Sequence, residues 1–163
     1  MTKAWASEKK GFTIVELLIV IVVIGVLAAI TVVAYNGMQQ RARDTKRAQD
    51  LSAIKKAILL YDTSNGGVYS SFNYSSAGPG GWDSSVQTNW LSFLRSSYGN
   101  MPVDPVNSST TDPTNGNDDW AYFYYCYNAG SGPLPATANV RIGYRSEQTG
   151  SYVDSRFAVE RCL

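Results

Sequence analysis

Residues 9–35 read KKGFTIVELLIVIVVIGVLAAITVVAY, and after the two lysines they contain a single charge, Glu16. The run 17–34 has 18 residues without any charge. As a helix that rises about 1.5 Å per residue, it spans roughly 27 Å, close to the hydrocarbon thickness of a bilayer. The run is apolar on every face, unlike a surface helix of a soluble domain. It therefore favours a membrane span over the alternative, a buried core helix.

The helix is expected to continue beyond this apolar run. A secretory signal peptide would end in a small-residue A-x-A site, but Gln, Arg and Lys follow the run instead. Residues 36–62 contain no proline, and apolar side chains recur there at three- and four-residue spacing. This stripe consists of Ala48, Leu51, Ile54, Ile58 and Tyr61. The pattern predicts one helix over 12–62, with a membrane part at 12–35, an amphipathic part at 36–62 and an end before Asn65-Gly66-Gly67.

Composition and charge exclude several functional classes. The chain has no histidine, which removes Ser-His-Asp and Cys-His nucleophile pairs and histidine-ligated zinc. It has neither a paired-carboxylate motif nor a phosphate-binding loop, so we expect no enzymatic activity. The formal net charge of +1 argues against broad electrostatic binding of nucleic acid. That total conceals a segregation, because residues 1–11 carry +2, residues 41–56 carry +4 and residues 57–163 carry −4.

Glu16 is the unusual residue of the apolar stretch. A carboxylate near a bilayer centre costs roughly 2.5–3.5 kcal/mol on insertion scales, and less near an edge. One interpretation is that Glu16 reaches the headgroups, because it lies one turn into the span. The other starts from Phe12, which lies four residues earlier on the same helix face. A cut between Gly11 and Phe12 would create an amine there that could neutralise Glu16 within one chain or between neighbouring chains.

Residues 9–20, KKGFTIVELLIV, resemble the class III signal of type IV prepilins and of type II secretion pseudopilins. That signal joins a short basic leader and a glycine to Phe, Thr, a branched pair, Glu and an apolar helix. The resemblance implies that residues 1–11 are a leader, that prepilin peptidase cleaves after Gly11 on the cytoplasmic side, and that Phe12 is N-methylated. It also implies that Glu16 neutralises a neighbouring subunit's amine during assembly. Many pilins have a proline near Val33, so the resemblance does not extend to a helix break there.

The orientation of the span is ambiguous from charge alone. Basic residues lie before the span (Lys3, Lys9, Lys10) and after it (Arg41, Arg43, Lys46, Arg47). The positive-inside rule slightly favours a head inside the cytoplasm. The resemblance implies the opposite, a precursor in the inner or cytoplasmic membrane with its head extracytoplasmic, and this is the orientation we expect.

Residues 63–163 are expected to form a globular head. The sequence predicts a loop at 63–85, a short helix at 86–98 and a polar loop at 107–119. Three strands follow at 120–128, 139–146 and 152–162, separated by glycine-containing turns, and they predict an antiparallel sheet. The helix stripe that ends at Tyr61 would cover the apolar face of this sheet. The expected fold class is α+β, a pilin-like ladle whose long N-terminal transmembrane helix packs by its second half on a small antiparallel sheet.

The two cysteines, Cys126 and Cys162, are expected in the first and last of these strands. A disulfide between them would fix the C-terminus and contribute roughly 3–4 kcal/mol in the chain-entropy model. It requires an oxidising compartment, which an extracytoplasmic head provides. The alternative is two free buried thiols.

A calcium site is one hypothesis for the polar loop. Residues 102–105, PVDP, resemble the P-x-D-P region of the major pseudopilin of type II secretion, whose loop before the last strands binds calcium. The candidate oxygen donors here are Asp104, Asp112, Asn115, Asn117, Asp118 and Asp119. The EF-hand pattern fails, because Cys126 takes its twelfth place. The alternative is ordinary polar turn chemistry, so calcium is a possible cofactor rather than an expected one.

Three further features each have two or more interpretations. The aromatic run Tyr122, Phe123, Tyr124, Tyr125 and Tyr127 would pack in the core and between subunits, or form an exposed adhesive or DNA-stacking surface. The basic cluster at 41–47 would be a solvated helix face, or meet anionic headgroups, or meet acids of neighbouring subunits. Gly25 and Ala29 form a small-xxx-small pair that would allow close helix approach, or reflect ordinary span composition.

The sequence thus predicts a type IV pilin-like structural subunit that polymerises through its N-terminal helix into an extracellular filament. Expected partners are further copies of the chain, the membrane, prepilin peptidase and the pilus assembly machinery, with no specific nucleic acid. One alternative is a pseudopilin of a type II secretion or competence system. The other is a single-pass membrane-anchored binding protein.

Overall fold

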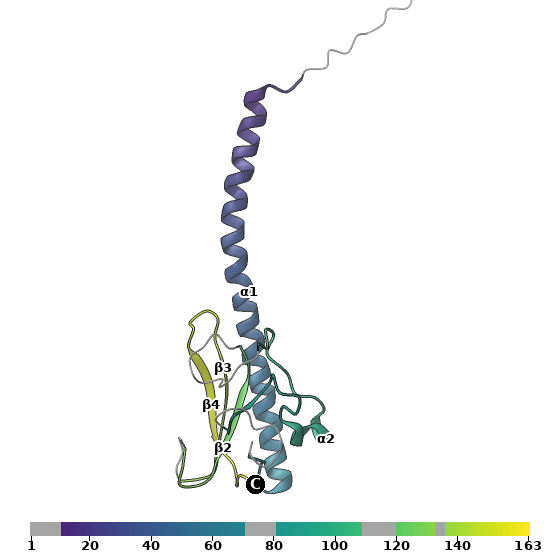
Figure 1. Cartoon of the computed structure of the whole chain (residues 1–163), viewed down its shortest axis with the longest axis vertical. Helices are drawn as coiled ribbons and strands as arrows, with labels where there is room; N and C mark the ends of the chain where they lie inside the picture. Colours follow the sequence, from purple (N-terminus) through teal and green to yellow (C-terminus); the bar gives the residue numbers. More distant parts are fainter. Residues whose placement is uncertain (1–10, 71–80, 109–119, 133–135) are drawn as a thin grey trace, which may run out of the picture. The chain divides into compact units, whose positions relative to one another are not determined.

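A computed structural model describes residues 11–70, 81–108, 120–132 and 136–163 (Figure 1). The chain forms two compact units, residues 1–39 and residues 40–163. In chain order the elements are α1 (Ile14–Asn65), β1 (Asp83–Ser84), the 3-10 helix η2 (Ser92–Leu94), α2 (Arg95–Tyr98), β2 (Phe123–Tyr127), β3 (Asn139–Arg145) and β4 (Tyr152–Ala158). This is the α+β arrangement that the sequence predicts.

The first unit contains the apolar part of α1. Its large apolar side chains are exposed, from Val23 at 50% to Ile14 at 83%. An 18-residue window of α1 has a mean hydropathy of 3.3, and none of that window is buried. By length and composition, α1 can cross a membrane.

The second unit is built around the C-terminal half of α1, which lies alongside the sheet (Figure 1). Leu51, Ile54 and Ile58 are buried and share one core cluster with residues of all three long strands, among them Tyr124, Val140 and Phe157. The helix stripe therefore covers the sheet as predicted. The N-terminal end of the stripe was predicted incorrectly, because Ala48 is exposed. The buried positions in this part of α1 are Asp44, Arg47 and Asp50.

The sheet has four antiparallel strands in the order β1-β2-β3-β4. Cys126 of β2 lies opposite Val140 of β3, which in turn lies opposite Phe157 of β4. The three predicted strands are confirmed, with shorter bounds. The expected loop at 63–85 also contains β1, a strand that was not predicted. Its two residues pair with Phe123 and Tyr124 of β2.

Two predicted helix boundaries differ from the structure. α1 runs to Asn65, three residues beyond Asp62, and ends where the Gly66 and Gly67 N–H groups donate to the Asp62 carbonyl. Gly66 has a φ of 66°, a conformation that glycine adopts without steric cost at a helix C-terminus. The predicted helix at 86–98 is reduced to η2 and α2, because Leu91 has a left-handed φ of 43° that interrupts helical geometry.

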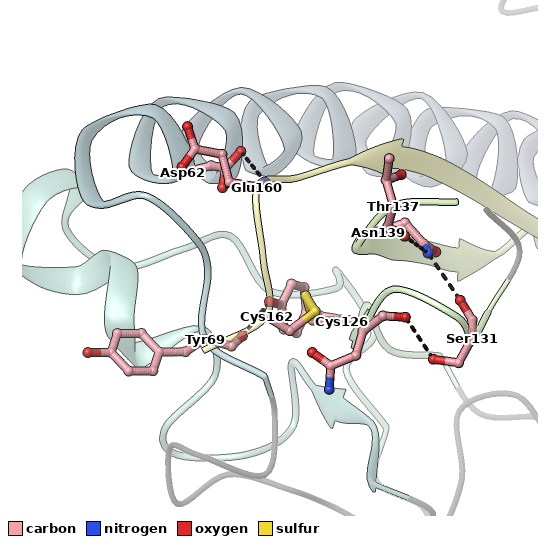
Figure 2. The surroundings of a disulfide bond; sticks show 10 residues. Asp62, Tyr69, Cys126, Ser131, Thr137, Asn139, Glu160 and Cys162 are labelled. Atoms are coloured by element: carbon pink, nitrogen blue, oxygen red, sulfur yellow. Dashed lines mark hydrogen bonds between the residues drawn. A yellow bond between two sulfur atoms is a disulfide. The ribbon is translucent and has the colours of Figure 1, made fainter. Parts of the chain in front are cut away.

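The C-terminal segment returns to the end of α1 (Figure 2). The Val68 N–H donates to the Arg161 carbonyl, and the Leu163 N–H donates to the Val68 carbonyl. Cys126 and Cys162 form a disulfide with their Cα atoms 5.8 Å apart, which confirms the predicted bond. Cys162 was wrongly placed in the last strand, because β4 ends at Ala158 and Cys162 instead forms an isolated bridge with Val68.

Candidate processing and assembly site

Thr13 and Glu16 close the N-terminal end of α1. The Thr13 N–H and the Thr13 hydroxyl each donate to Glu16 Oε2 at 2.8 Å, and the Glu16 N–H donates to Thr13 Oγ1 at 3.2 Å. This is the reciprocal capping box of the pattern T-x-x-E. The pattern lies directly before the apolar run, so the sequence alone could have predicted the pair, although a role was predicted only for Glu16.

Gly11 and Phe12 precede the helix in an accessible segment. Both residues are exposed, and the exposed fraction of Phe12 is 80%. A Cβ atom added to Gly11 would meet nothing within 4 Å. The fold of this chain therefore imposes no steric need for glycine at this position, and a requirement for it has to come from another molecule.

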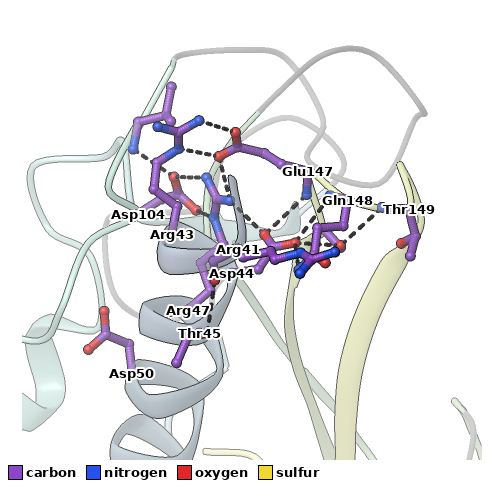
Figure 3. Close-up of polar contacts among 12 residues, drawn as sticks. Arg41, Arg43, Asp44, Thr45, Arg47, Asp50, Asp104, Glu147, Gln148 and Thr149 are labelled. Atoms are coloured by element: carbon purple, nitrogen blue, oxygen red, sulfur yellow. Dashed lines mark hydrogen bonds and ion pairs between the residues drawn. The ribbon is translucent and has the colours of Figure 1, made fainter. Parts of the chain in front are cut away.

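Arg47 is the centre of a buried ionic network at the start of the second unit (Figure 3). Its side chain is completely buried, as is that of Asp104. Its Nε and Nη2 atoms donate to the two Asp104 oxygens at 2.7 and 2.9 Å. Its Nη1 atom donates to Asp44 Oδ1 at 2.9 Å and to Glu147 Oε1 at 2.6 Å. Arg47 thus joins α1 to the segment before residue 109 and to the turn between β3 and β4.

Neighbouring groups complete this network. Arg43 donates to both oxygens of Glu147, and the Glu147 and Gln148 N–H groups donate to the Asp44 carboxylate. Burial acts to raise the pKa of Asp44, but hydrogen bonds from Ser146, from the Glu147 N–H and from Arg47 outweigh it and lower the pKa to about 2. The hydrogen bonds from Arg43 and Arg47 likewise lower the pKa of Glu147, against the effect of burial. Both acids therefore remain charged at neutral pH.

The network corrects the interpretations of the basic cluster at 41–47. All three alternatives placed the partners of these cations in solvent, lipid or another subunit. Arg43 and Arg47 instead pair with acids of their own chain, more than fifty residues away in the case of Asp104 and Glu147. Two cations of residues 41–56 are therefore neutralised by two acids of residues 57–163 inside the second unit.

Of the six candidate calcium donors, only Asp104 lies among the residues that the structure describes. Asp104 is bound to Arg47, while Asp112, Asn115, Asn117, Asp118 and Asp119 lie outside the described residues. Within the described ranges, no group of three or more His, Cys, Asp or Glu residues is arranged to hold a metal ion.

The aromatic run of β2 and the residue before it packs on both faces of the sheet. Tyr122 and Tyr124 are buried against α1, where Tyr122 donates its hydroxyl proton to Asp50 and Tyr124 donates to the Tyr69 carbonyl. On the other face, Trp82 packs against Phe123 and Tyr125 with ring centroids 5.3 and 5.0 Å apart. The core packing predicted for this run is confirmed, whereas packing between subunits stays a prediction.

Comparison with known proteins finds similarity over part of the chain. Residues 7–32 match the prokaryotic N-terminal methylation motif. The chain is 36% identical over 59 residues to type II secretion system core protein G of Escherichia coli (strain K12), which covers 36% of this chain and 41% of that protein. It is 43% identical over 51 residues to a fimbrial protein of Pseudomonas aeruginosa, which covers 31% of this chain and 33% of that protein. It is 44% identical over 52 residues to the type IV major alpha-pilin of Moraxella bovis, which covers 32% of this chain and 33% of that protein.

These matches span between a third and about two fifths of the length of the curated relatives. No solved structure matches the chain. The resemblance predicted from residues 9–20 is confirmed at this level, because the chain carries the N-terminal methylation motif and its relatives include type IV pilins and a type II secretion core protein.

Proposed function

We propose that this chain is a type IV pilin-like structural subunit that is processed after Gly11 and polymerises through α1. The observation that carries the proposal is the junction itself. An accessible Gly11-Phe12 bond leads into the Thr13–Glu16 capping box and then into an apolar helix segment in which none of the described side chains is buried. Such a segment needs either lipid or copies of itself around it, and a structural subunit uses both in turn.

Processing would create the charge that assembly needs. Hydrolysis of the Gly11–Phe12 amide leaves a carboxylate on Gly11 and an amine on Phe12. This amine would then accept a methyl group, an expectation that the methylation motif at residues 7–32 supports. Prepilin peptidase and the assembly machinery are the implied partners. The methylated amine remains a cation, so it can still pair with a carboxylate.

Glu16 would be the partner of that cation in a neighbouring subunit. Among the described residues, the contacts of its carboxylate are made by Oε2. Oε1 is thus available to accept a hydrogen bond from an amine while the capping box remains closed. Pairing two charges in an apolar medium offsets the cost of burying either alone, which would set the register of adjacent helices.

The disulfide supports an extracytoplasmic second unit. Disulfides persist in oxidising compartments and are rare in the cytosol. The Cys126–Cys162 bond therefore favours the orientation implied by the N-terminal motif over the weak charge preference for a head inside. The apolar segment of α1 would first hold the precursor in the membrane and then form the interior of an extracellular filament.

A pseudopilin of a secretion system is the second candidate. Core protein G is among the relatives, and residues 102–105 resemble its P-x-D-P region. Both functions use the same processing and the same helix, so their difference lies in where the polymer forms. Long surface fibres that contain this chain would favour the pilin. Cells that need the chain for protein secretion but form no such fibres would favour the pseudopilin.

Mass spectrometry of the mature N-terminus tests the proposal directly. The chain purified from membranes should begin at Phe12 and carry one added methyl group. A Gly11→Val variant is the matched control. It should fold, because nothing lies within 4 Å of an added Cβ atom at this position. It should not be cleaved, so it should retain Met1 and accumulate in the membrane. A wild-type chain that keeps its first eleven residues in cells with an active prepilin peptidase would refute the proposal.

A further inference from the structure

The surroundings of Asp104 bear on the calcium hypothesis. Two of the hydrogen bonds to its carboxylate come from Arg47. Two more come from the Val106 and Asn107 N–H groups, which lie 2.9 and 3.3 Å from Oδ1. Three of these donors reach Oδ1 and the fourth, Arg47 Nε, reaches Oδ2. Both oxygens therefore already accept hydrogen bonds. A divalent cation at Asp104 would lie directly beside the guanidinium cation that binds both of these oxygens.

Arg47 also contacts the chain on both sides of residues 109–119. Asp104 precedes that segment and Trp120 follows it, and the Arg47 Cζ atom lies 5.2 Å from the centroid of the Trp120 ring. Hydrogen bonds also join the two residues that flank this segment, which together form its base. The Ser108 N–H donates to the Trp120 carbonyl at 3.0 Å, and the Trp120 N–H donates to Ser108 Oγ at 3.1 Å. Arg47 therefore contacts both ends of the segment.

A calcium ion and a guanidinium group can perform the same mechanical task by different chemistry. Calcium gathers six to eight oxygen ligands from separate segments and is lost when its concentration falls. A guanidinium has five N–H donors in a fixed plane and keeps its charge at any physiological pH. Here four hydrogen bonds from Arg47 reach three carboxylates on three segments, those of Asp44, Asp104 and Glu147.

We propose that the Arg47 guanidinium performs at Asp104 the cross-linking for which the resemblance suggested calcium. The base of the 109–119 segment is then fixed by a covalently attached cation, and the second unit is stable without calcium. This inference does not depend on filament assembly, since it concerns the fold of the second unit alone.

Thermal unfolding of the full-length chain in detergent micelles tests the proposal. Circular dichroism would follow the transition in excess EGTA and in millimolar CaCl2, for the wild type and for Arg47→Gln, Asp104→Asn and Lys46→Gln. The wild-type midpoint should be the same in both media. Arg47→Gln and Asp104→Asn should each lower it by roughly 10 °C in both media, because each leaves buried charge uncompensated. Lys46→Gln removes a cation whose side chain is 59% exposed, and its amide can still donate to the partner Asp50, so it should lower the midpoint much less.

The wild-type measurement decides the outcome even if a variant fails to fold. A calcium-dependent rise of the wild-type midpoint that Asp104→Asn abolishes would make Asp104 a calcium ligand and overturn the proposal. A rise that Asp104→Asn retains would also overturn it, because calcium would then stabilise the second unit from a site without Asp104. An Arg47→Gln chain as stable as Lys46→Gln would also overturn it, since Arg47 would then not hold the network together.

Discussion

Thr13 and Glu16 hydrogen-bond to each other in both directions at the first turn of α1. The relationship gives Glu16 two separable tasks. Its carboxylate caps the backbone N–H at the helix start, which lowers the cost of placing polar groups next to an apolar run. In the proposed filament it also supplies the negative charge that meets an amine. Capping needs an acceptor oxygen, whereas pairing needs the charge.

Substitutions at these two positions should separate the tasks. Glu16→Gln keeps an oxygen that can complete a capping box but removes the charge, so we expect insertion and cleavage to persist while filament assembly is lost. Thr13→Val removes the hydroxyl and keeps the charge, so the helix start should lose about 1 kcal/mol while assembly is reduced but present. Immunoblots of sheared surface fractions and membrane fractions would measure assembly, and the mature mass would report cleavage. Wild-type filament yield from Glu16→Gln would show that the charge plays no part.

The cysteine pair gives a prediction for the stability of the second unit. The disulfide joins β2 to the segment after β4, which returns to Val68 at the end of α1. A Cys126→Ser/Cys162→Ser variant should lose about 2–4 kcal/mol of unfolding free energy, because its unfolded chain is less constrained. Denaturant unfolding in micelles would measure the loss. Reduced wild type is the matched control and should behave like the double variant. Equal midpoints for oxidised and reduced wild type would contradict the prediction.

Periodic features of the sequence predicted most of this fold. The uniform apolar run and the stripe through Ile54 and Ile58 located α1, because helix period and burial are local properties of the chain. The strand predicted at 120–128 located β2 in the same way, because strand-forming residues bounded by turns are also a local signal. β1 was missed because a strand of two residues is too short to show any period.

The ionic network was missed for a different reason. Only the Asp44–Arg47 pair is local, at a separation of three residues, and it was visible as a helix neighbour pair. Arg47 is buried because Asp104 and Glu147 reach it from 57 and 100 residues away, and no local pattern reports such a meeting. Ala48 was placed in the stripe because apolar character was used to assign burial, whereas here the charged neighbour occupies the buried position.

Asp44 should make the second unit sensitive to acid. Its pKa of about 2 in the folded chain lies below the ordinary value of about 3.9 for an unfolded chain. The stabilisation is therefore complete above about pH 4 and is lost as the pH falls toward 2, and it amounts to about 2 kcal/mol. Urea unfolding between pH 2 and pH 5 would show a steeper loss for wild type than for Asp44→Asn. Glu160→Gln removes an exposed carboxylate and should follow wild type. Parallel curves for wild type and Asp44→Asn would contradict the assignment.

Asp83 should produce the opposite dependence in a separate pH range. Its side chain is buried, and burial raises the pKa of its carboxyl to about 8, although the Leu91 and Ser84 N–H groups act to lower it. The folded chain then holds a proton that the unfolded chain has already released, so stability falls as the pH rises from about 4 to about 8. The chain has no histidine, so no imidazole titrates within this range.

Asp83→Asn removes that proton and should flatten the profile. Between pH 5 and pH 8 the unfolding midpoint of wild type should fall, whereas that of Asp83→Asn should stay nearly constant, so the variant gains relative to wild type by more than about 1 kcal/mol. Asp83→Ala is the control for the hydrogen bonds, because it removes the acceptor of the Leu91 N–H and one of the two acceptors of the Ser84 N–H, and it should be less stable at every pH. Calorimetry in detergent micelles at four pH values would compare the three chains. If wild type and Asp83→Asn lose stability in parallel, the carboxyl is already ionised in the folded chain at pH 5, and Asp83 of β1 is a buried anion rather than a buried acid.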